Sequence, residues 1–268
     1  MLYNYHTHTK RCGHAGGEDR EYVEAAINSG IKVLGFSDHS PMIYDPDPGP
    51  SVDHRMAVSM FDDYCNSVLS LKEEYKKDIE IHLGVEIEYY PKYFDKTYEL
   101  LKNHGIEYMI LGQHYTGNQS QKCSRYSGAD TKDEETFNDY VNTVAEQIAT
   151  GRFSYVAHPD LINFSVDNAI REAGFCKICE ASVKYGVPLE VNVLGIQENR
   201  AYPKRDFWKM AGEMGVQMII GIDAHNPRSI ISAEQNFLAW EPFLKECGVD
   251  VSRETFLDFE GRIKKVLL

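Results

Sequence analysis

Short apolar runs alternate with longer amphipathic ones along this 268-residue chain, and the alternation is the strongest constraint on its fold. Seven of the short runs read as β-strands, because they are rich in Val, Ile, Leu and Tyr and several are almost continuously apolar. They cover residues 2–8, 32–39, 79–88, 108–114, 153–159, 188–195 and 216–225. Nearly continuous apolar strands are typical of parallel sheets that are covered on both faces.

Helical patterns lie between these strands. The first, EDREYVEAAINSG, begins with acidic residues and ends in glycine, which are ordinary start and stop signals. The others cover residues 57–77, 94–104, 133–150, 169–185 and 203–214, and a C-terminal pair covers 232–247 and 253–267. Seven strands, each followed by a helix, predict a βα barrel or an open doubly wound sheet. The chain has no GxGxxG or P-loop motif to support a nucleotide-binding sheet.

Composition favours one α/β domain spanning residues 1–268. The 43% of hydrophobic residues can bury a large core, and no Gly/Ser-rich linker marks a boundary. The net charge of −13 argues against nucleic-acid binding, which needs a basic surface, but it allows an anionic substrate beside metal ions. Without a long apolar stretch or a signal peptide, we expect no membrane span and a cytoplasmic location. A homodimer is a working hypothesis.

Histidines and carboxylates collect where the predicted strands end. The set comprises His6, His8 and His14 at or after the first strand, His39, Glu86, His114 and His158 on the next four, and Asp223 and His225 on the seventh. One HxH pair is weak evidence for a metal site, whereas six strand ends that agree are strong evidence. In a βα barrel this end carries the active site. We therefore predict a shared metal centre.

Nine candidate ligands are too many for one ion. A catalytic ion takes about three protein ligands and keeps a position open for water or substrate. The set therefore predicts about three divalent ions, with Glu86 and Asp223 as candidate bridging ligands. Imidazoles and carboxylates without thiolate suit Zn, Mn or Fe. We interpret His54, His82 and His104 as structural, although the loop around His54 can reach a substrate, and the Cys176–Cys179 pair as ordinary thiols of a helix.

These motifs, in this order, resemble the PHP family of metal-dependent phosphoesterases, named for polymerase and histidinol phosphatase domains. The matching segments are HTH (6–8), His14, SDH (37–39), GVE (84–86), QH (113–114), AHP (157–159) and DAH (223–225). The resemblance covers essentially the whole chain. It implies a distorted (β/α)7 TIM-like barrel with up to three metal ions, in agreement with the seven predicted strands.

Two segments are similar to the stand-alone histidinol-phosphate phosphatases of that family: SDHSPM and residues 190–227. The similarity implies hydrolysis of L-histidinol phosphate to L-histidinol and phosphate, a step of histidine biosynthesis. Gln197 and Glu198 depart from the pattern, because relatives carry basic residues there. Three alternatives stay open: another PHP phosphoesterase acting on phosphotyrosine or nucleotides, an amidohydrolase-like enzyme, and a non-catalytic metal-binding protein.

The reaction implied by the resemblance assigns roles to several residues. Asp223 orients or deprotonates the attacking water, and His225 or a bound water protonates the leaving alkoxide. A phosphate dianion suits a guanidinium fork, for which Arg200 is the first candidate and Arg125 the second. Lys204 and Arg205 read as the exposed start of a helix. Three further residues beside ligand positions are weaker candidates for substrate contact: Glu88, Tyr115 and Asp160.

Overall fold

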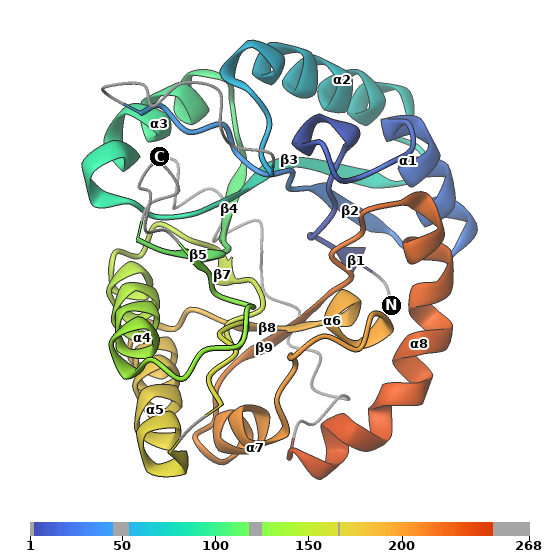
Figure 1. Ribbon diagram of the computed structural model, residues 1–268. Coiled ribbons are helices and arrows are strands. Elements are labelled where there is room, and N and C mark those ends of the chain that lie inside the picture. Colours follow the sequence, from blue (N-terminus) through green and yellow to red (C-terminus); the bar gives the residue numbers. More distant parts are fainter. Residues whose placement is uncertain (1–2, 45–53, 118–124, 166, 249–268) are drawn as a thin grey trace.

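A computed structural model describes residues 3–44, 54–117, 125–165 and 167–248, and it contains a seven-stranded parallel sheet (Figure 1). The strands are β1 (Tyr3–Asn4), β2 (Val33–Phe36), β3 (Glu80–Ile87), β4 (Tyr108–Leu111), β7 (Tyr155–Val156), β8 (Leu189–Asn192) and β9 (Met218–Gly221). Each pairs in parallel with the next in this order. All seven strands lie within the predicted runs.

The segments that follow β1 and β9 close the sheet into a barrel. Thr7 forms a parallel bridge with Ala224. The His8 amide donates to the Ala224 carbonyl (2.9 Å), and the Ala224 amide donates to the His6 carbonyl (3.0 Å). Because these contacts lie beyond the regular strands, the barrel is distorted. The structure confirms the (β/α)7 TIM-like barrel over the open sheet.

Helices surround the barrel as an outer layer (Figure 1). They are α1 (Asp19–Asn28), α2 (Phe61–Glu74), α3 (Pro91–Asn103), α4 (Glu134–Ala149), α5 (Asn168–Tyr185), α6 (Val193–Gln197), α7 (Arg205–Glu213) and α8 (Pro227–Glu246), with 3-10 turns η1 (Lys10–Cys12) and η2 (Val58–Met60). Local signals explain several ends. Asp133 caps α4 by accepting from the Thr136 amide, and α5 ends at Gly186 in the left-handed conformation.

The structure corrects the prediction in two places. The run 188–195 is a strand only to Asn192, because the Asn192 side chain accepts a hydrogen bond from the Gly195 amide and so starts α6. A short hairpin of β5 (Tyr115–Thr116) and β6 (Arg125–Tyr126) follows β4 and was not predicted. The predicted helix over 253–267 lies outside the described residues.

Aromatic residues fill the barrel beneath the predicted site. Tyr108 is fully buried, and its hydroxyl donates to the carbonyls of Tyr5 (2.8 Å) and Phe36 (3.0 Å). Gly35 on β2 and Gly84 on β3 leave room for its ring, since a Cβ at either position would overlap it. The filled interior makes the barrel a packed core that supports a site only at its rim.

The five cysteines of the described residues are all free thiols, in line with the sequence interpretation. Cys179 is buried and Cys176 is partly exposed on α5. In the part of the chain that the structure describes, no helix is long and apolar enough to cross a membrane.

Candidate metal centre

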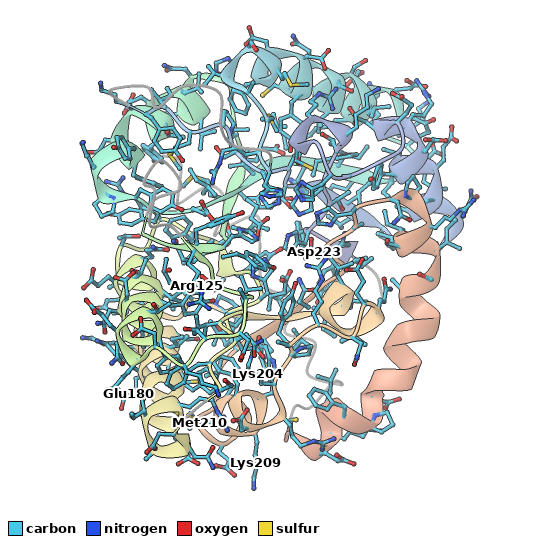
Figure 2. All side chains as sticks on the ribbon, viewed as in Figure 1. Arg125, Glu180, Lys204, Lys209, Met210 and Asp223 are labelled. Atoms are coloured by element: carbon cyan, nitrogen blue, oxygen red, sulfur yellow. The ribbon has the colours of Figure 1, made fainter. Side chains whose placement is uncertain are left out.

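The strand ends bring the nine predicted ligands to one rim of the barrel. His6, His8 and His14 follow β1, His39 follows β2, Glu86 is on β3, His114 follows β4, His158 follows β7, and Asp223 and His225 follow β9. Parallel strands of a barrel all end at the same rim, which is why residues far apart in sequence meet there. Figure 2 labels Asp223 inside the ring of helices.

The Glu86 carboxylate lies between two groups of imidazoles. Its Oε2 atom is 3.1 Å from His39 Nδ1 and 3.5 Å from His8 Nε2. Its Oε1 atom is 3.0 Å from His158 Nε2 and 3.6 Å from His114 Nε2. Tetrahedral ligands held about 2.1 Å from one zinc ion lie about 3.4 Å apart. The spacings on both sides of Glu86 therefore match donor atoms that share ions.

Asp223 approaches the same centre from the segment that follows β9, where the barrel closes against the segment that follows β1. Its Oδ1 atom is 3.0 Å from His8 Nε2, 3.4 Å from His6 Nε2 and 3.3 Å from His225 Nδ1. Its Oδ2 atom accepts from Asn192 Nδ2 (3.1 Å). The Nε2 atoms of His6 and His8 are themselves only 3.1 Å apart. Nε2 of His6, Nε2 of His8 and Oδ1 of Asp223 thus all lie within 3.4 Å of one another.

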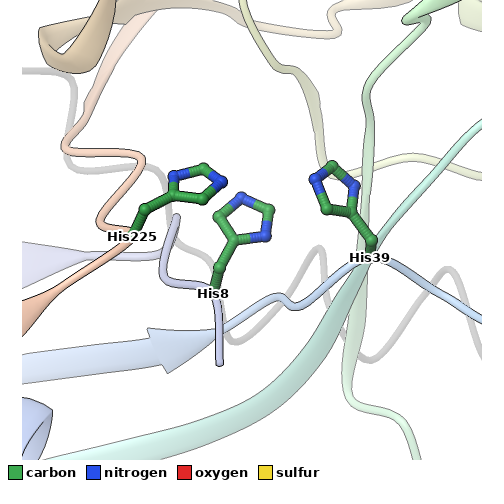
Figure 3. A group of neighbouring side chains, drawn as sticks. All are labelled: His8, His39 and His225. Atoms are coloured by element: carbon green, nitrogen blue, oxygen red, sulfur yellow. The ribbon is translucent and has the colours of Figure 1, made fainter. Parts of the chain in front are cut away.

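Figure 3 shows the rings of His8, His39 and His225 converging at the rim. The centroid of the His8 ring is 4.3 Å from that of His39 and 4.1 Å from that of His225. His14 stands slightly apart, with its ring centroid 4.8 Å from His225 and 5.1 Å from His39. Its Nδ1 atom faces the Cys12 carbonyl at 3.2 Å. Among the described residues, His14 joins none of the tight groups of donor atoms that could hold an ion.

The donor set fits divalent cations. Within the described part of the chain, Glu86 Oε2 and Asp223 Oδ1 are buried and accept no hydrogen bond. Buried carboxylate oxygens without donors are costly and rare unless a cation pairs with them. Imidazole nitrogens surround both atoms at 3.0–3.6 Å. Such sites suit Zn, Mn or Fe.

The carboxylates create a field that favours positive charge at this point. Burial opposes protonation of His6, but Asp223, Glu190 and Glu86 outweigh it and raise its pKa to about 10. Burial also opposes ionisation of Asp223, yet nearby histidines such as His6 and His225 hold its pKa well below its usual range. The same field that stabilises a proton on His6 stabilises a metal ion.

Two of the nine residues have strained backbone. His158 has φ 31° and Asp223 has φ 56°, in the left-handed region that favours glycine. Strained backbone conformations persist only where surrounding contacts stabilise them, and they are concentrated at functional sites. Here the His158 amide donates to Glu190 Oε2 (3.0 Å), and Asp223 is held by Asn192.

A cavity of about 410 Å³ opens above the cluster. Seven of the predicted ligands line it: His14, His39, Glu86, His114, His158, Asp223 and His225. His6 and His8 lie below its floor and are fully buried. The remaining wall is formed by Tyr115, Tyr126, Tyr202, His54, Arg55, Glu88 and Arg200. A cluster of candidate metal ligands with an aromatic and cationic wall suits a small anionic substrate that carries a ring.

A family model described as the PHP domain matches residues 4–194. The chain belongs to the PHP domain family. The match confirms the resemblance drawn from the histidine motifs. The match ends before Arg200, Asp223 and His225, which the structure places in the wall of the same cavity.

Relatives of this PHP domain include histidinol-phosphatases. The chain is 27% identical to a protein of Deinococcus radiodurans named "Probable histidinol-phosphatase", over 85% of this chain and 88% of the relative. It is 25% identical to the "Histidinol-phosphatase" of Bacillus subtilis, over 90% of this chain and 98% of the relative.

Solved structures share the barrel. A crystal structure from Listeria monocytogenes matches with a TM-score of 0.73 at 21% identity, over 88% of this chain and 99% of that one. A histidinol phosphate phosphatase of Lactococcus lactis, complexed with Zn, L-histidinol and phosphate, matches with a TM-score of 0.67 at 18% identity, over 92% and 94%. These likenesses establish the fold of the PHP domain.

The two candidate arginines of the PHP domain lie differently. Arg200 lines the cavity, where its Nη1 atom donates to Tyr202 Oη (3.0 Å) and its other nitrogens bind Glu198. Arg125 does not line the cavity: its side chain is exposed and donates to the Asp130 carbonyl. Alternation along β6 turns Tyr126 to the cavity and Arg125 away from it. The structure therefore argues against the Arg125 prediction.

The three remaining histidines divide as the sequence suggested. His82 lies near the opposite end of β3, and His104 caps the end of α3 with its ring bonded to the Leu100 carbonyl and to Asp62. His54 lines the cavity, with its ring centroid 5.6 Å from that of His14. The loop that carries it does reach the candidate substrate site.

Two acidic residues behind the ligands, Asp38 and Glu190, were not singled out by the sequence reasoning. Asp38 Oδ1 is 3.4 Å from His8 Nδ1, and Glu190 Oε1 is 2.7 Å from His6 Nδ1. Glu88 accepts from the His114 amide (3.0 Å), from Arg55 and from Tyr90, so its oxygens are already occupied. The available signal was an acidic residue inside a strand or at its end, as in SDH and LEVN.

Likewise, Asp160 and Lys204 support the cavity wall from outside. The Asp160 side chain accepts from the Lys204 amide, and the Lys204 ammonium donates to the Asp160 carbonyl (2.6 Å). Neither lines the cavity. Their contacts anchor the end of the loop that carries Arg200, so their role is to hold this loop rather than to touch a substrate.

Proposed function

We propose that this PHP domain is a metal-dependent phosphomonoester hydrolase that converts L-histidinol phosphate to L-histidinol and phosphate. The observation that carries the proposal is the convergence of six histidines, all of the predicted ones except His14, on the carboxylates of Glu86 and Asp223, beneath a cavity that Arg200 lines. The relatives named histidinol-phosphatase support the substrate. So does the structural match that contains Zn, L-histidinol and phosphate.

About three divalent ions of Zn, Mn or Fe would be held by the nine residues. Glu86 would help to hold ions with both of its oxygens, because they face different groups of imidazoles. Asp223 would contribute Oδ1, which lies 3.0–3.4 Å from nitrogen atoms of His6, His8 and His225. When bound, such ions lower the pKa of water and neutralise the charge of a phosphoryl group.

Asp223 has the role of orienting the attacking water. Its strongly depressed pKa makes it a weak base, and its Oδ2 atom is fixed by Asn192. Burial and the neighbouring His8 lower the pKa of His225 to about 3, which favours the neutral ring that a metal ligand needs. The leaving alkoxide would take its proton from His225 or from a bound water.

Arg200 binds the phosphate. Its guanidinium is oriented by Tyr202 and Glu198 at the edge of the cavity, and a fork of N–H donors matches two phosphate oxygens. The imidazole ring of the substrate would pack against the tyrosines of the wall, of which Tyr115 and Tyr126 come from the hairpin. Aromatic faces suit a flat heterocycle.

Phosphate release by metal-reconstituted protein tests the proposal. L-Histidinol phosphate is compared with p-nitrophenyl phosphate and phosphotyrosine at equal concentration. We expect a preference of about 100-fold or more in kcat/KM, which is roughly 2.7 kcal/mol of differential transition-state binding. Comparable slow rates on all three would keep the phosphoesterase class and reject the histidinol phosphate assignment.

A further inference from the structure

Glu190 is a carboxylate enclosed in the barrel beneath the candidate metal centre. It alternates along β8 with Leu189 and Val191, which pack in the core between sheet and helices, so its side chain points into the barrel. It is fully buried. Gly221 on the adjacent strand β9 makes room for it, because a Cβ there would overlap the carboxylate. A glutamate is rarely buried this completely unless its carboxylate is paired, so the burial of Glu190 calls for an explanation.

Within the described residues, the hydrogen bonds to Glu190 come from two candidate ligands and from Asn192, which also binds a third. Its Oε1 atom is 2.7 Å from His6 Nδ1. Its Oε2 atom accepts from the His158 amide (3.0 Å) and from Asn192 Nδ2 (2.9 Å), and the same Asn192 nitrogen donates to Asp223. Glu190 thus contacts three of the nine candidate ligands. It binds the ring of His6 and the strained backbone of His158 directly, and it reaches Asp223 through the Asn192 amide.

The contact with His6 fixes which ring nitrogen faces the centre. When Nδ1 donates its proton to a carboxylate, the lone pair of Nε2 is left for a metal ion. His6 Nε2 lies 3.4 Å from Asp223 Oδ1 and 3.6 Å from Glu86 Oε2, at the point where the donors converge. The corresponding contacts of His8 with Asp38 (3.4 Å) and of His114 with Glu88 (3.5 Å) are longer.

The charge of the Glu190 carboxylate also ties this residue to the candidate metal centre. Among the described residues, no lysine or arginine pairs with Glu190, and His6 is its one ion-pair partner. A buried carboxylate without a counter-ion is strongly unfavourable. The positive charge that balances Glu190 must therefore come from the centre itself, through His6.

We infer that Glu190 is a positioning residue that holds His6 in the metal-binding tautomer and orients His158 and Asp223 around the ions. This inference rests on the metal site of the proposed function. It assigns no contact between Glu190 and the substrate. Partners of this kind typically change metal affinity or activity by about 10–100-fold when they are replaced.

The substitution Glu190→Gln tests the inference. Glutamine keeps the shape but offers one acceptor and one amide donor to three donors, so at least one donor must face its NH2 group. If that donor is His6, the ring takes the other tautomer and Nε2 no longer binds a metal. Glu190→Asp keeps the charge but shortens the reach, and it serves as the second variant if the glutamine variant does not fold.

The readouts are zinc affinity, measured by competition with a chromophoric chelator, and the visible absorption of the cobalt-substituted protein. The matched control is Glu107→Gln, which replaces a half-buried glutamate that accepts from the Leu83 amide and contacts His82 near the opposite end of β3. We expect Glu190→Gln, or Glu190→Asp in its place, to weaken zinc binding about 10–100-fold and to alter the cobalt bands, with Glu107→Gln unchanged in both.

Two results would overturn the inference, and they are distinguishable. If the original chain binds zinc and the Glu190 variants bind it with equal affinity and unchanged cobalt bands, Glu190 does not position the ligands, while the proposed function stands. If the original chain binds no divalent ion, the proposed function fails as well.

Discussion

Strand β3 brings histidine and carboxylate together at both of its ends, and the two ends behave differently. Near its N-terminal end, His82 Nε2 is 2.8 Å from Glu80 Oε1, and His82 Nδ1 is 3.3 Å from Glu107 Oε2. Lys72 also pairs with Glu107. At the C-terminal end, Glu86 faces imidazoles on both of its oxygens, with no lysine or arginine paired to it in the described chain.

The difference lies in the balance of donors and acceptors rather than in residue type. Glu107 accepts from Lys72 and from the Leu83 amide (2.8 Å), so its charge is matched by protein donors. Glu86 Oε2 is buried and lacks a donor among the described residues. A histidine–carboxylate cluster indicates a metal centre only when its buried acceptors outnumber its donors.

Replacing Glu86 gives the largest expected effect. Glu86→Gln removes the proposed bridging ligand, and we expect kcat/KM for phosphate release to fall about 1000-fold, roughly 4 kcal/mol. Glu80→Gln at the other end of β3 should leave the rate within about twofold, because Glu80 is half-exposed and contacts only His82 among the described residues. Equal losses in both variants would break the comparison.

Zinc should stabilise the protein only when the histidines and carboxylates at the C-terminal ends of the strands are intact. At a free ion concentration 100 times Kd, binding adds about 2.7 kcal/mol to the free energy of unfolding. We expect zinc to raise the Tm of the chain and of His82→Ala, but to raise it much less in His6→Ala. Chelator-treated samples measured by calorimetry provide the reference. An equal zinc effect in all three proteins would contradict the placement of the ions.

Arg200→Met tests whether the rim also provides the cation for phosphate. Charged hydrogen bonds contribute about 1.5–3 kcal/mol, so kcat/KM for L-histidinol phosphate should fall about 10- to 100-fold. Arg125→Met is the matched control, since Arg125 is exposed and points away from the cavity. A loss confined to Arg125→Met would restore the prediction that the structure argues against.

The smallest predicted effect is on the free energy of unfolding at low pH, and it concerns Glu107 near the N-terminal end of β3. Burial opposes ionisation of Glu107, but hydrogen bonds from His82 and Lys72 lower its pKa to about 2. A depressed pKa contributes stability above the unfolded pKa near 4.5, and this is lost as pH falls toward 2. Urea unfolding of metal-free protein should show Glu107→Gln about 1 kcal/mol less stable at pH 6, after allowance for its partial exposure. The gap should close below pH 4, and a constant gap would contradict this origin.

The residues at the rim could be predicted from the sequence because all parallel strands of a barrel end at the same rim. Each apolar run ends at the same rim, so Glu86 and Asp223 could be placed together before their distances were known. The interior carboxylate Glu190 was missed, since one acidic residue in LEVN differs little from an ordinary polar position of a strand.

Loop residues were harder to predict than strand ends. Arg55 reaches the cavity wall through its pairing with Glu88, and Arg125 turns away because of the β5–β6 hairpin. Neither direction is encoded by apolar periodicity, which fixes strands and helices but not the path of a connection. Asn192 shows the same limit. The apolar pattern extended the predicted strand to Gly195, but Asn192 caps α6, so the strand ends there.

Anomalous diffraction from zinc-loaded crystals tests the central claim most directly. Data collected on both sides of the zinc absorption edge locate each ion without reference to a model of the ligands. We predict about three peaks beside Glu86 and Asp223, each about 2.0–2.2 Å from imidazole nitrogens or carboxylate oxygens, and none beside His82. A peak at His82 with no density at Glu86 would contradict the account.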